Sequence, residues 1–383
     1  MAIAPYDLTP IVSIALVGAL LAIGPAAWVW RRQRGRGASA RLHALTVLTL
    51  CLTFDLVLFG AFTRLTDSGL GCPDWPGCYG SASPLGAHAQ IGAAQSVLPE
   101  GPVTHGKAWV EMIHRYLATG VGALIVVLAV LSWIEVRRRT LAISPWWAGA
   151  TLVWVCLQGA FGALTVTMKL YPLIVTLHLL GGMVLLVLLA VQTQAAPRAP
   201  LALPRGLHAA ALALAALSAL QIALGGWVST NYAVLACGEF PACQGSWWPT
   251  MDFAHGFALL RELGAGKDGA ALPFAALIAI HYVHRLVAYL VLVAMGLFAW
   301  RLFATGDAAL RPWAMGTAVI ALWQLASGLS NVVLGWPLIG AVAHTAGAAA
   351  WVTLLAMLIT RARVARPAMA PQGRAGRTWQ PAP

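Results

Sequence analysis

The stretch "EMIHRYLATGVG", residues 111–122, has a partner in "HYVHRLVAYLVL", residues 281–292, where the same His-Arg pair returns 170 positions later. Both stretches lie in long apolar segments. Ionisable residues are rare in such segments, and those that occur are usually functional. A histidine at the same place in two apolar segments therefore indicates a duplicated membrane fold, with a task for the histidine in each copy.

The composition is typical of a multi-pass membrane protein. Of the 383 residues, 60% are hydrophobic and only 9% are charged, and the mean hydropathy is +0.78. A helix needs about 20 mostly apolar residues to cross a bilayer. The first such segment is interpreted as a retained helix rather than a signal peptide, because its basic residues follow it. The predicted spans are 9–30, 44–63, 109–132, 146–168, 172–192, 207–229, 278–300, 312–335 and 338–360.

Further segments match between the two halves of the chain, in the same order and at nearly the same offset. The matched pairs are 58–80 with 223–245, 157–166 with 323–332, and 172–182 with 337–348. Such self-similarity predicts two parallel four-helix units, related by an axis along the membrane normal. The expected fold class is all-α: a polytopic membrane protein with two pseudosymmetric four-helix transmembrane bundles plus one extra N-terminal transmembrane helix.

The domain boundaries follow from this register and from the charged stretches between spans. We expect an extra transmembrane helix with a basic cytoplasmic loop at 1–43, a first bundle at 44–200, a second bundle at 201–360 and a disordered basic cytoplasmic tail at 361–383.

Arginine placement predicts the orientation, because basic loops stay in the cytoplasm. A periplasmic N-terminus and a cytoplasmic C-terminus put most of the 24 Lys and Arg residues inside, as expected for a multi-pass protein of a bacterial inner (cytoplasmic) membrane. Topology and attraction to anionic lipid then explain the net charge of +12, and nucleic-acid binding does not. The inside residues are Arg31, Arg32, Arg34, Arg36, Arg41, Arg137, Arg138, Arg139, Arg198, Arg205, Arg301, Arg311, Arg361, Arg363, Arg366, Arg374 and Arg377.

Two cysteine pairs with the same spacing fall in predicted outer loops. Cys72 and Cys78 lie in the first half, and Cys237 and Cys243 lie in the second. An oxidising compartment permits disulfide bonds there. Zinc bound by all four thiolates is the alternative, although the spacing is not that of a metal knuckle.

One histidine stands in each of four matched helices, five or six residues from its predicted outer end. The four are His114 and His178 in the first unit and His284 and His344 in the second. Any one of them could be a polar residue bonded to a neighbouring helix. Two histidines at one depth, about 8 Å below the surface, can instead clamp a heme from both faces. The sequence therefore predicts one heme site in each unit.

The two halves differ three residues before the first histidine of each pair, where Glu111 stands in one and His281 in the other. Positions i and i+3 share a helix face, so Glu111 is expected to point towards the heme that His114 would hold and to accept a proton or stabilise positive charge. The alternative is a structural carboxylate paired with Arg115. Arg115 and Arg285 could bind heme propionates or anchor their helices at the membrane interface, and the sequence favours neither role. It gives no role for Asp55.

The combined motifs resemble the heme A synthase family of cytochrome oxidase assembly. They are "FGAFTRLTDSGLGCPDWPGCYG", "EMIHR", "TLHLLGG", "HYVHR" and "AHTAGA", and the resemblance covers about residues 44 to 360. It implies two pseudosymmetric four-helix bundles and oxidation of a methyl group of heme O to the formyl group of heme A. The helix at 9–30 has no counterpart in the eight-helix pattern of the family.

The resemblance also implies roles for single residues. His114 and His178 would be the ligands at the substrate heme O site, and His284 and His344 those of the cofactor heme b. The required glutamate of the ExxH motif falls on Glu111. The outer-loop cysteines fall on Cys72 and Cys78, with a second pair at Cys237 and Cys243.

Expected partners are heme O, membrane lipid, heme O synthase and cytochrome oxidase assembly factors. The electron donor, the oxygen source and the oligomeric state stay open, a homo-oligomer included. A di-heme b-type electron carrier and a non-enzymatic heme exporter or chaperone are the competing functions. A loop closed by Cys72 and Cys78 is expected to cover the substrate pocket on the outer side.

Overall fold

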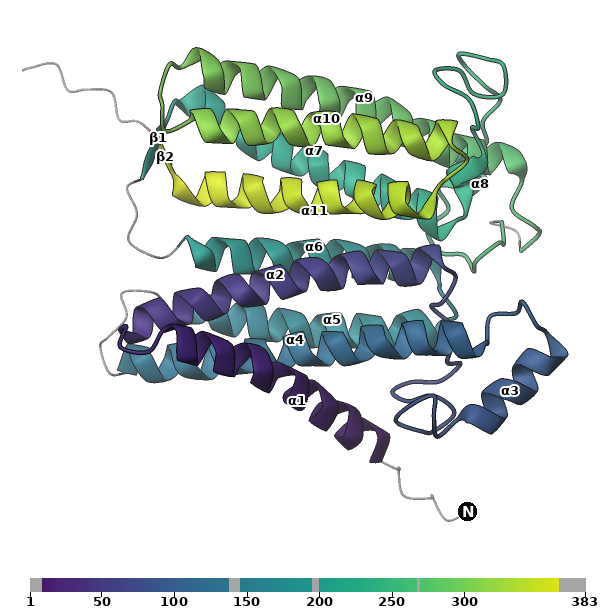
Figure 1. The fold of residues 1–383 in the computed structure, drawn as a ribbon. Coiled ribbons are helices and arrows are strands. Elements are labelled where there is room, and N and C mark those ends of the chain that lie inside the picture. Colours follow the sequence, from purple (N-terminus) through teal and green to yellow (C-terminus); the bar gives the residue numbers. More distant parts are fainter. Residues whose placement is uncertain (1–8, 138–144, 195–199, 267–268, 365–383) are drawn as a thin grey trace, which may run out of the picture.

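The computed structural model describes residues 9–137, 145–194, 200–266 and 269–364. Long helices run side by side in two stacked groups, with the connecting loops gathered at the two ends (Figure 1). In the described ranges, nine helices are long and apolar enough to cross a membrane, and each corresponds to one predicted span. The prediction of an all-α multi-pass membrane protein is therefore confirmed.

The first group contains α1 to α6, and the second contains α7 to α11. The first-half helices are α1 (Thr9–Arg32), α2 (Ala38–Leu65), α3 (His88–Val97), α4 (His105–Arg137), α5 (Trp146–Thr167) and α6 (Pro172–Thr193). The second-half elements are β1 (Leu201–Leu203), α7 (Arg205–Thr230), the 3-10 turn η1 (Ala233–Leu235), α8 (Phe253–Gly256), α9 (Phe274–Ala304), α10 (Arg311–Val333), α11 (Leu338–Arg361) and β2 (Ala362–Val364).

The matched helices of the two halves meet one another at the interface between the bundles. Helix α6 of the first bundle packs on its counterpart α11 and on α7, and α2 packs on α11. At the loop end, Nη2 of Arg64 donates to the carbonyl of Ser229 at 2.6 Å, and the Tyr232 hydroxyl donates to Asp67 at 2.8 Å.

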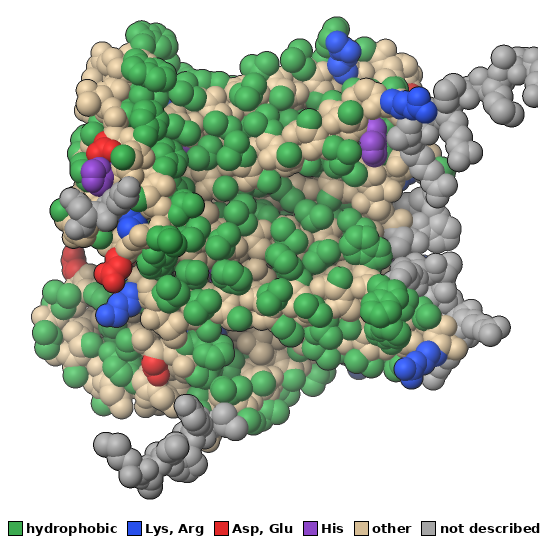
Figure 2. All heavy atoms as spheres, turned by 180° about the vertical axis from the view of Figure 1, so that it is seen from behind, with side chains coloured by type: hydrophobic (Ala, Val, Ile, Leu, Met, Phe, Trp, Pro, Cys, Tyr) green, Lys and Arg blue, Asp and Glu red, His purple; other side chains and the backbone are tan. Residues whose placement is uncertain are grey.

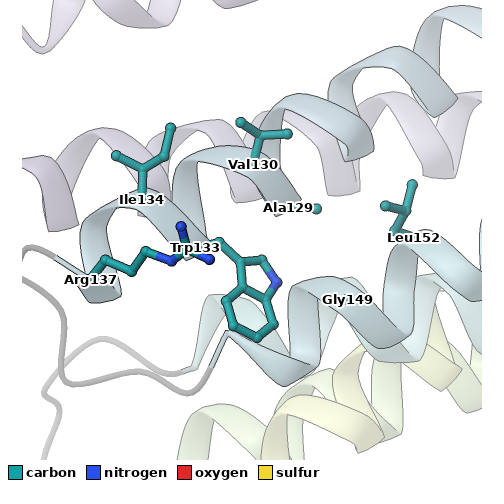
Figure 3. Close-up of a pocket in the computed structure, with 7 residues that line it drawn as sticks. All are labelled: Ala129, Val130, Trp133, Ile134, Arg137, Gly149 and Leu152. Carbon is teal, nitrogen blue, oxygen red and sulfur yellow. The ribbon is translucent and has the colours of Figure 1, made fainter.

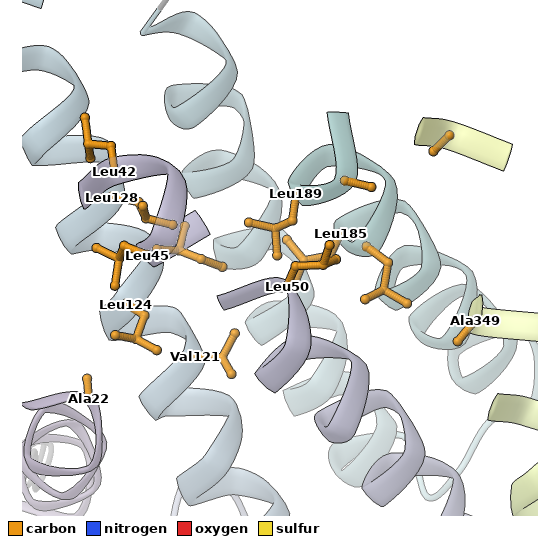
Figure 4. Packing of buried hydrophobic residues seen from close by; sticks show 14 of the residues in the cluster. Ala22, Leu42, Leu45, Leu50, Val121, Leu124, Leu128, Leu185, Leu189 and Ala349 are labelled. Atoms are coloured by element: carbon orange, nitrogen blue, oxygen red, sulfur yellow. The ribbon is translucent and has the colours of Figure 1, made fainter. Parts of the chain in front are cut away.

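Apolar side chains fill the interior of each bundle. Leucines and valines of α2, α4 and α6 form the core of the first half, and Ala349 of α11 touches it from the second half (Figure 4). A second core lies among α7, α9, α10 and α11. Figure 2 shows a largely apolar belt with charged side chains at its two ends, the surface expected of a protein that spans a bilayer.

The extra helix α1 packs on α4 through a close approach of the two backbones. A Cβ on Gly18 would lie 2.4 Å from Thr119, so only glycine permits this contact. The helix therefore belongs to the first bundle, as its outermost member (Figure 1).

The ends of two helices differ from the expectation. Helices α4 and α9 begin at His105 and Phe274, four residues before the predicted spans. His114 and His284 therefore lie nine and ten residues from the helix starts, and not five or six. The added turns extend beyond the apolar run because they pack on the outer loops: a Cβ on Gly71 would lie 2.4 Å from the Lys107 backbone.

The predicted tail, 361–383, begins in structured residues. Arg361 ends α11, and Ala362–Val364 pair in parallel with Leu201–Leu203 as a two-stranded sheet. The rest of the tail and the inside residues Arg138, Arg139, Arg198, Arg366, Arg374 and Arg377 lie outside the described residues.

Candidate functional site

Each of the four histidines lies against a glycine of the preceding long helix. The facing glycines are Gly60 for His114, Gly162 for His178, Gly225 for His284 and Gly328 for His344. A Cβ at these positions would lie 3.0, 3.4, 3.1 and 3.2 Å from the nearest imidazole atom, closer than most side chains tolerate. All four imidazoles are partly accessible rather than sealed in the core. We call these four residues the facing glycines.

The histidines of each half act as a pair. The imidazoles of His114 and His178 are close enough to interact electrostatically, and so are those of His284 and His344. Helices α4 and α6 hold one pair, and α9 and α11 hold the other. The structure thus brings together the residues that the repeat predicted to share a site.

Hydrogen bonding distinguishes the two pairs. In the second half, Nε2 of Gln221 lies 3.1 Å from Nδ1 of His284, and Oγ of Ser327 lies 3.0 Å from Nδ1 of His344. In the first half, Nδ1 of His178 is buried without a hydrogen-bond partner. His114 stacks on Phe59, with ring centroids 6.3 Å apart.

Glu111 is buried at the junction between α4 and the first cysteine loop. Its carboxylate forms an ion pair with Arg115 and accepts a hydrogen bond of 2.8 Å from the backbone amide of Cys72. The side chain is only 4% exposed, so this carboxylate is held in one place away from bulk water. The ion pair with Arg115 agrees with the hypothesis that Glu111 is a structural carboxylate. Its place on α4, one turn before His114, agrees equally with the hypothesis that Glu111 is catalytic.

The arginines after the first histidines hold the cysteine loops. Arg115 donates to the carbonyls of Pro76 and Gly77. Arg285 donates to the carbonyls of Cys237, Glu239 and Ala242 at 2.6 to 3.1 Å. Each arginine thus acts as a clamp between its helix and its loop. The suggested contact with heme propionates stays a prediction.

The second half has the same clamp with a different partner. His281 stands where the first half has Glu111, and its Nε2 accepts from Nε of Arg285 at 3.3 Å while its Nδ1 lies 3.0 Å from the carbonyl of Ala233. The geometry is shared, but only the first half has a carboxylate in it. The difference between the halves therefore lies in the chemistry of one side chain.

Disulfide bonds join Cys72 to Cys78 and Cys237 to Cys243, so the zinc alternative is not formed. Each closes a ring in which an acidic side chain caps the backbone: Asp74 accepts from the amides of Tyr79 and Gly80, and Glu239 accepts from Gly245. Each short ring is therefore held both by its disulfide bond and by an acidic side chain, and it lies against the first half of α4 or α9.

Other polar residues lie apart from the histidine pairs. The structure stacks His88 on His105, with ring centroids 4.4 Å apart, a contact that their separation in sequence does not reveal. His255 bonds to Asp252 in a loop turn, and Asp55 is exposed on α2. In the described part of the chain, no three His, Cys, Asp or Glu side chains gather in a way that could hold a metal ion.

A groove on the side of the first bundle is a different feature. It has a volume of about 350 Å³ and lies between α4 and α5, where Trp133 and Arg137 flank it (Figure 3). Its nearest residue on α4, Ala129, is 15 positions beyond His114, which is about 22 Å along the helix. The groove is therefore not part of the histidine site.

Fold and site together define a multi-pass membrane protein with a histidine pair in each of two pseudosymmetric bundles. Residues 43–358 match the COX15-CtaA family, described as cytochrome oxidase assembly protein, and the chain belongs to this family. It is 38% identical over 324 residues to the heme A synthase of Shewanella oneidensis, covering 84% of this chain and 95% of that protein.

More distant relatives cover most of the chain as well. The heme A synthase of Methylobacterium radiotolerans is 29% identical over 355 residues, covering 87% of this chain and 92% of that protein. The heme A synthase of Halalkalibacterium halodurans is 27% identical over 300 residues, covering 76% of this chain and 86% of that protein.

Proposed function

We propose that the chain is a heme A synthase, an oxidoreductase that converts a methyl group of heme O into the formyl group of heme A for cytochrome oxidase. Family membership and the heme A synthase relatives support this assignment. At the level of residues, the supporting observation is a carboxylate that only one half has. The clamp of the first half contains Glu111, and the matched clamp of the second half contains His281.

The residues around the histidines fit a planar group the size of a heme. Four glycines face the imidazoles, and a Cβ at Gly60, Gly225 or Gly328 would crowd the ring that it faces. Nδ1 of His178 is buried without a partner, as expected of a ring whose hydrogen bonding changes when it binds. In this proposal His114 and His178 hold heme O, and His284 and His344 hold heme b.

Heme b supplies one-electron redox chemistry when bound. The residues of the chain position the substrate and move protons. The clamp of Arg115 and the Cys72 amide fixes the Glu111 carboxylate near the substrate face of α4, where it accepts a proton as the methyl group is oxidised. Conversion of the methyl group into a formyl group is a four-electron oxidation of that carbon that adds one oxygen atom, so the oxidant and the oxygen come from outside this chain.

The multi-pass topology supports a protein of the bacterial inner membrane, with the N-terminus and the cysteine loops periplasmic and the C-terminus cytoplasmic. Heme O is amphipathic and reaches the site from the membrane. Heme O synthase, which makes this substrate, and other assembly factors are therefore the expected partners.

The pigments of the purified protein test the function. Protein produced in cells that also make heme O is expected to yield heme b together with heme A or a hydroxylated intermediate on extraction and mass analysis. Heme b alone would favour the electron carrier. A single exchangeable heme without any oxidised product would favour the exporter or chaperone.

Opening the first cysteine loop should affect the substrate site alone. The Cys72→Ser/Cys78→Ser variant is expected to lower heme O turnover several-fold while keeping heme b, because the loop carries the amide that orients Glu111. Turnover and heme b content are measured beside Cys237→Ser/Cys243→Ser, the matched change in the other half. Wild-type turnover in the first variant would contradict a covering role for this loop.

A further inference from the structure

Four residues before each facing glycine stands a side chain on the same helix face, and at one of the two matched positions it differs between the halves. Gln221 stands before Gly225 where Leu56 stands before Gly60, whereas Gln324 before Gly328 has its counterpart in Gln158 before Gly162. Because i and i+4 lie on one helix face, each of these side chains lies beside the histidine that its glycine faces. These positions decide whether the imidazole has a polar neighbour.

In the second half both imidazoles are bonded at Nδ1. Gln221 lies 3.1 Å from Nδ1 of His284 and also donates to the backbone carbonyl of that residue at 3.2 Å. Oγ of Ser327 lies 3.0 Å from Nδ1 of His344. With its amide oriented to satisfy both ends, Gln324 donates through Nε2 to the same nitrogen at 2.9 Å, where Nδ1 acts as an acceptor in the ring without iron, and accepts through Oε1 from the Ala348 amide at 2.8 Å.

In the first half the corresponding side chains cannot do this. Leu56 replaces Gln221, and Phe161 replaces Ser327. Gln158 corresponds to Gln324, and both pack on matched glycines of the next long helix, Gly181 and Gly347. Among the described residues, however, no hydrogen bond joins Gln158 to His178, whose Nδ1 is left buried and has no partner.

A histidine that binds iron through Nε2 keeps its proton on Nδ1, and an acceptor at that proton fixes the ring and makes the ligand more basic. The Ser327 hydroxyl can accept this proton directly. Gln221 can accept it only through Oε1, an atom that is buried and has no partner in the structure. This requires the terminal amide to turn by half a rotation, which exchanges the hydrogen bond to the His284 carbonyl for one from Nδ1.

We propose that Gln221 and Ser327 are positioning residues that orient His284 and His344, so that the second bundle retains its heme as a permanent cofactor. Leu56 and Phe161 leave the first pair without such partners, and the heme there can enter and leave. This inference rests on the proposed function, because it assigns a resident heme to one pair and an exchanging heme to the other.

The test replaces Gln221 by leucine, the residue that the first half carries at the matched position, which makes a folding failure unlikely to mask the result. We measure the midpoint potential of heme b, its electron paramagnetic resonance signature, and its rate of transfer to excess apomyoglobin. Loss of a hydrogen bond in the outer shell of a metal ligand typically weakens binding by about 10- to 100-fold. Faster transfer of about this size and a higher potential are expected, because a less basic ligand favours ferrous iron.

Two matched variants complete the design. Gln158→Leu removes a buried glutamine that contacts no histidine nitrogen, and it should leave the heme b potential and transfer rate unchanged. Leu56→Gln supplies the missing partner to His114, and it should raise the amount of heme O or heme A that copurifies with the protein.

The outcomes separate this inference from the function on which it rests. If the wild type binds heme b and forms heme A, but Gln221→Leu leaves the potential and the transfer rate unchanged, the positioning role is overturned. The assignment as a synthase is then unaffected. Wild-type protein without bound heme b would instead overturn the cofactor assignment itself.

Discussion

The Glu111→Gln variant is expected to bind heme b normally and to form at least about 100-fold less heme A than the wild type. Glutamine keeps the size of the side chain and can still accept from the Cys72 amide, but it cannot take up a proton or pair as an anion with Arg115. Protein from cells that make heme O is extracted, and its hemes are separated and weighed. Accumulated heme O, or a partly oxidised form, is the expected result.

The matched change in the other half is the control. His281→Gln alters the corresponding clamp residue, which bonds to Arg285 and to the carbonyl of Ala233. If Glu111 acts only by holding its loop, the two variants should lower heme A formation by similar amounts. A loss confined to Glu111→Gln identifies proton transfer as its task, whereas wild-type levels of heme A in that variant would make the carboxylate structural.

Side chains added at the facing glycines should remove one heme at a time. The Gly225→Val variant places a Cβ about 3.1 Å from Cε1 of His284 and is expected to weaken heme b binding. Overpacking of this kind costs about 1–3 kcal/mol, or about 5- to 150-fold in affinity. The Gly60→Val variant acts on His114 at 3.0 Å, and it should retain heme b while it lowers heme O binding and heme A formation.

Glycines in open positions of the helices that carry His284 and His114 serve as controls. A Cβ on Gly296 of α9 or on Gly122 of α4 would meet no atom within 4 Å, so valine there tests the effect of the substitution without the contact. Heme b is quantified by its pyridine hemochrome spectrum. Equal heme b loss in Gly225→Val and Gly296→Val would show that the facing glycines have no special role.

The sequence predicted the spans and the pairing of histidines because both depend on local patterns that a duplicated chain displays twice. Helix ends were less predictable, as α4 and α9 show. Their first turns are stabilised by loops that are distant in sequence, as in the approach of Gly71 to Lys107 on α4 and of Gly256 to Ala276 on α9. Hydropathy records only the apolar part of a helix, so these turns could not be found from it.

The roles of the arginines and of the glycines required the structure. Arg115 and Arg285 were expected to bind heme propionates or to anchor helices at the membrane interface. Their hydrogen bonds to loop carbonyls could not be predicted, because these bonds depend on how the cysteine rings pack against α4 and α9. The facing glycines were visible in the matched segments, because Gly225 repeats Gly60 and Gly328 repeats Gly162 at the offset of the repeat. Their recurrence in the helix before each histidine helix is the signal that could have identified them.

The short sheet between β1 and β2 bears on how such a protein arises. It places the start of the second bundle beside its end, at one face of the molecule. An even number of membrane crossings separates the two strands, so the chain leaves the unit on the side where it entered. Gene duplication can therefore append one unit to another through a short connection, without inverting either copy in the membrane, and each copy is then free to diverge into a separate task.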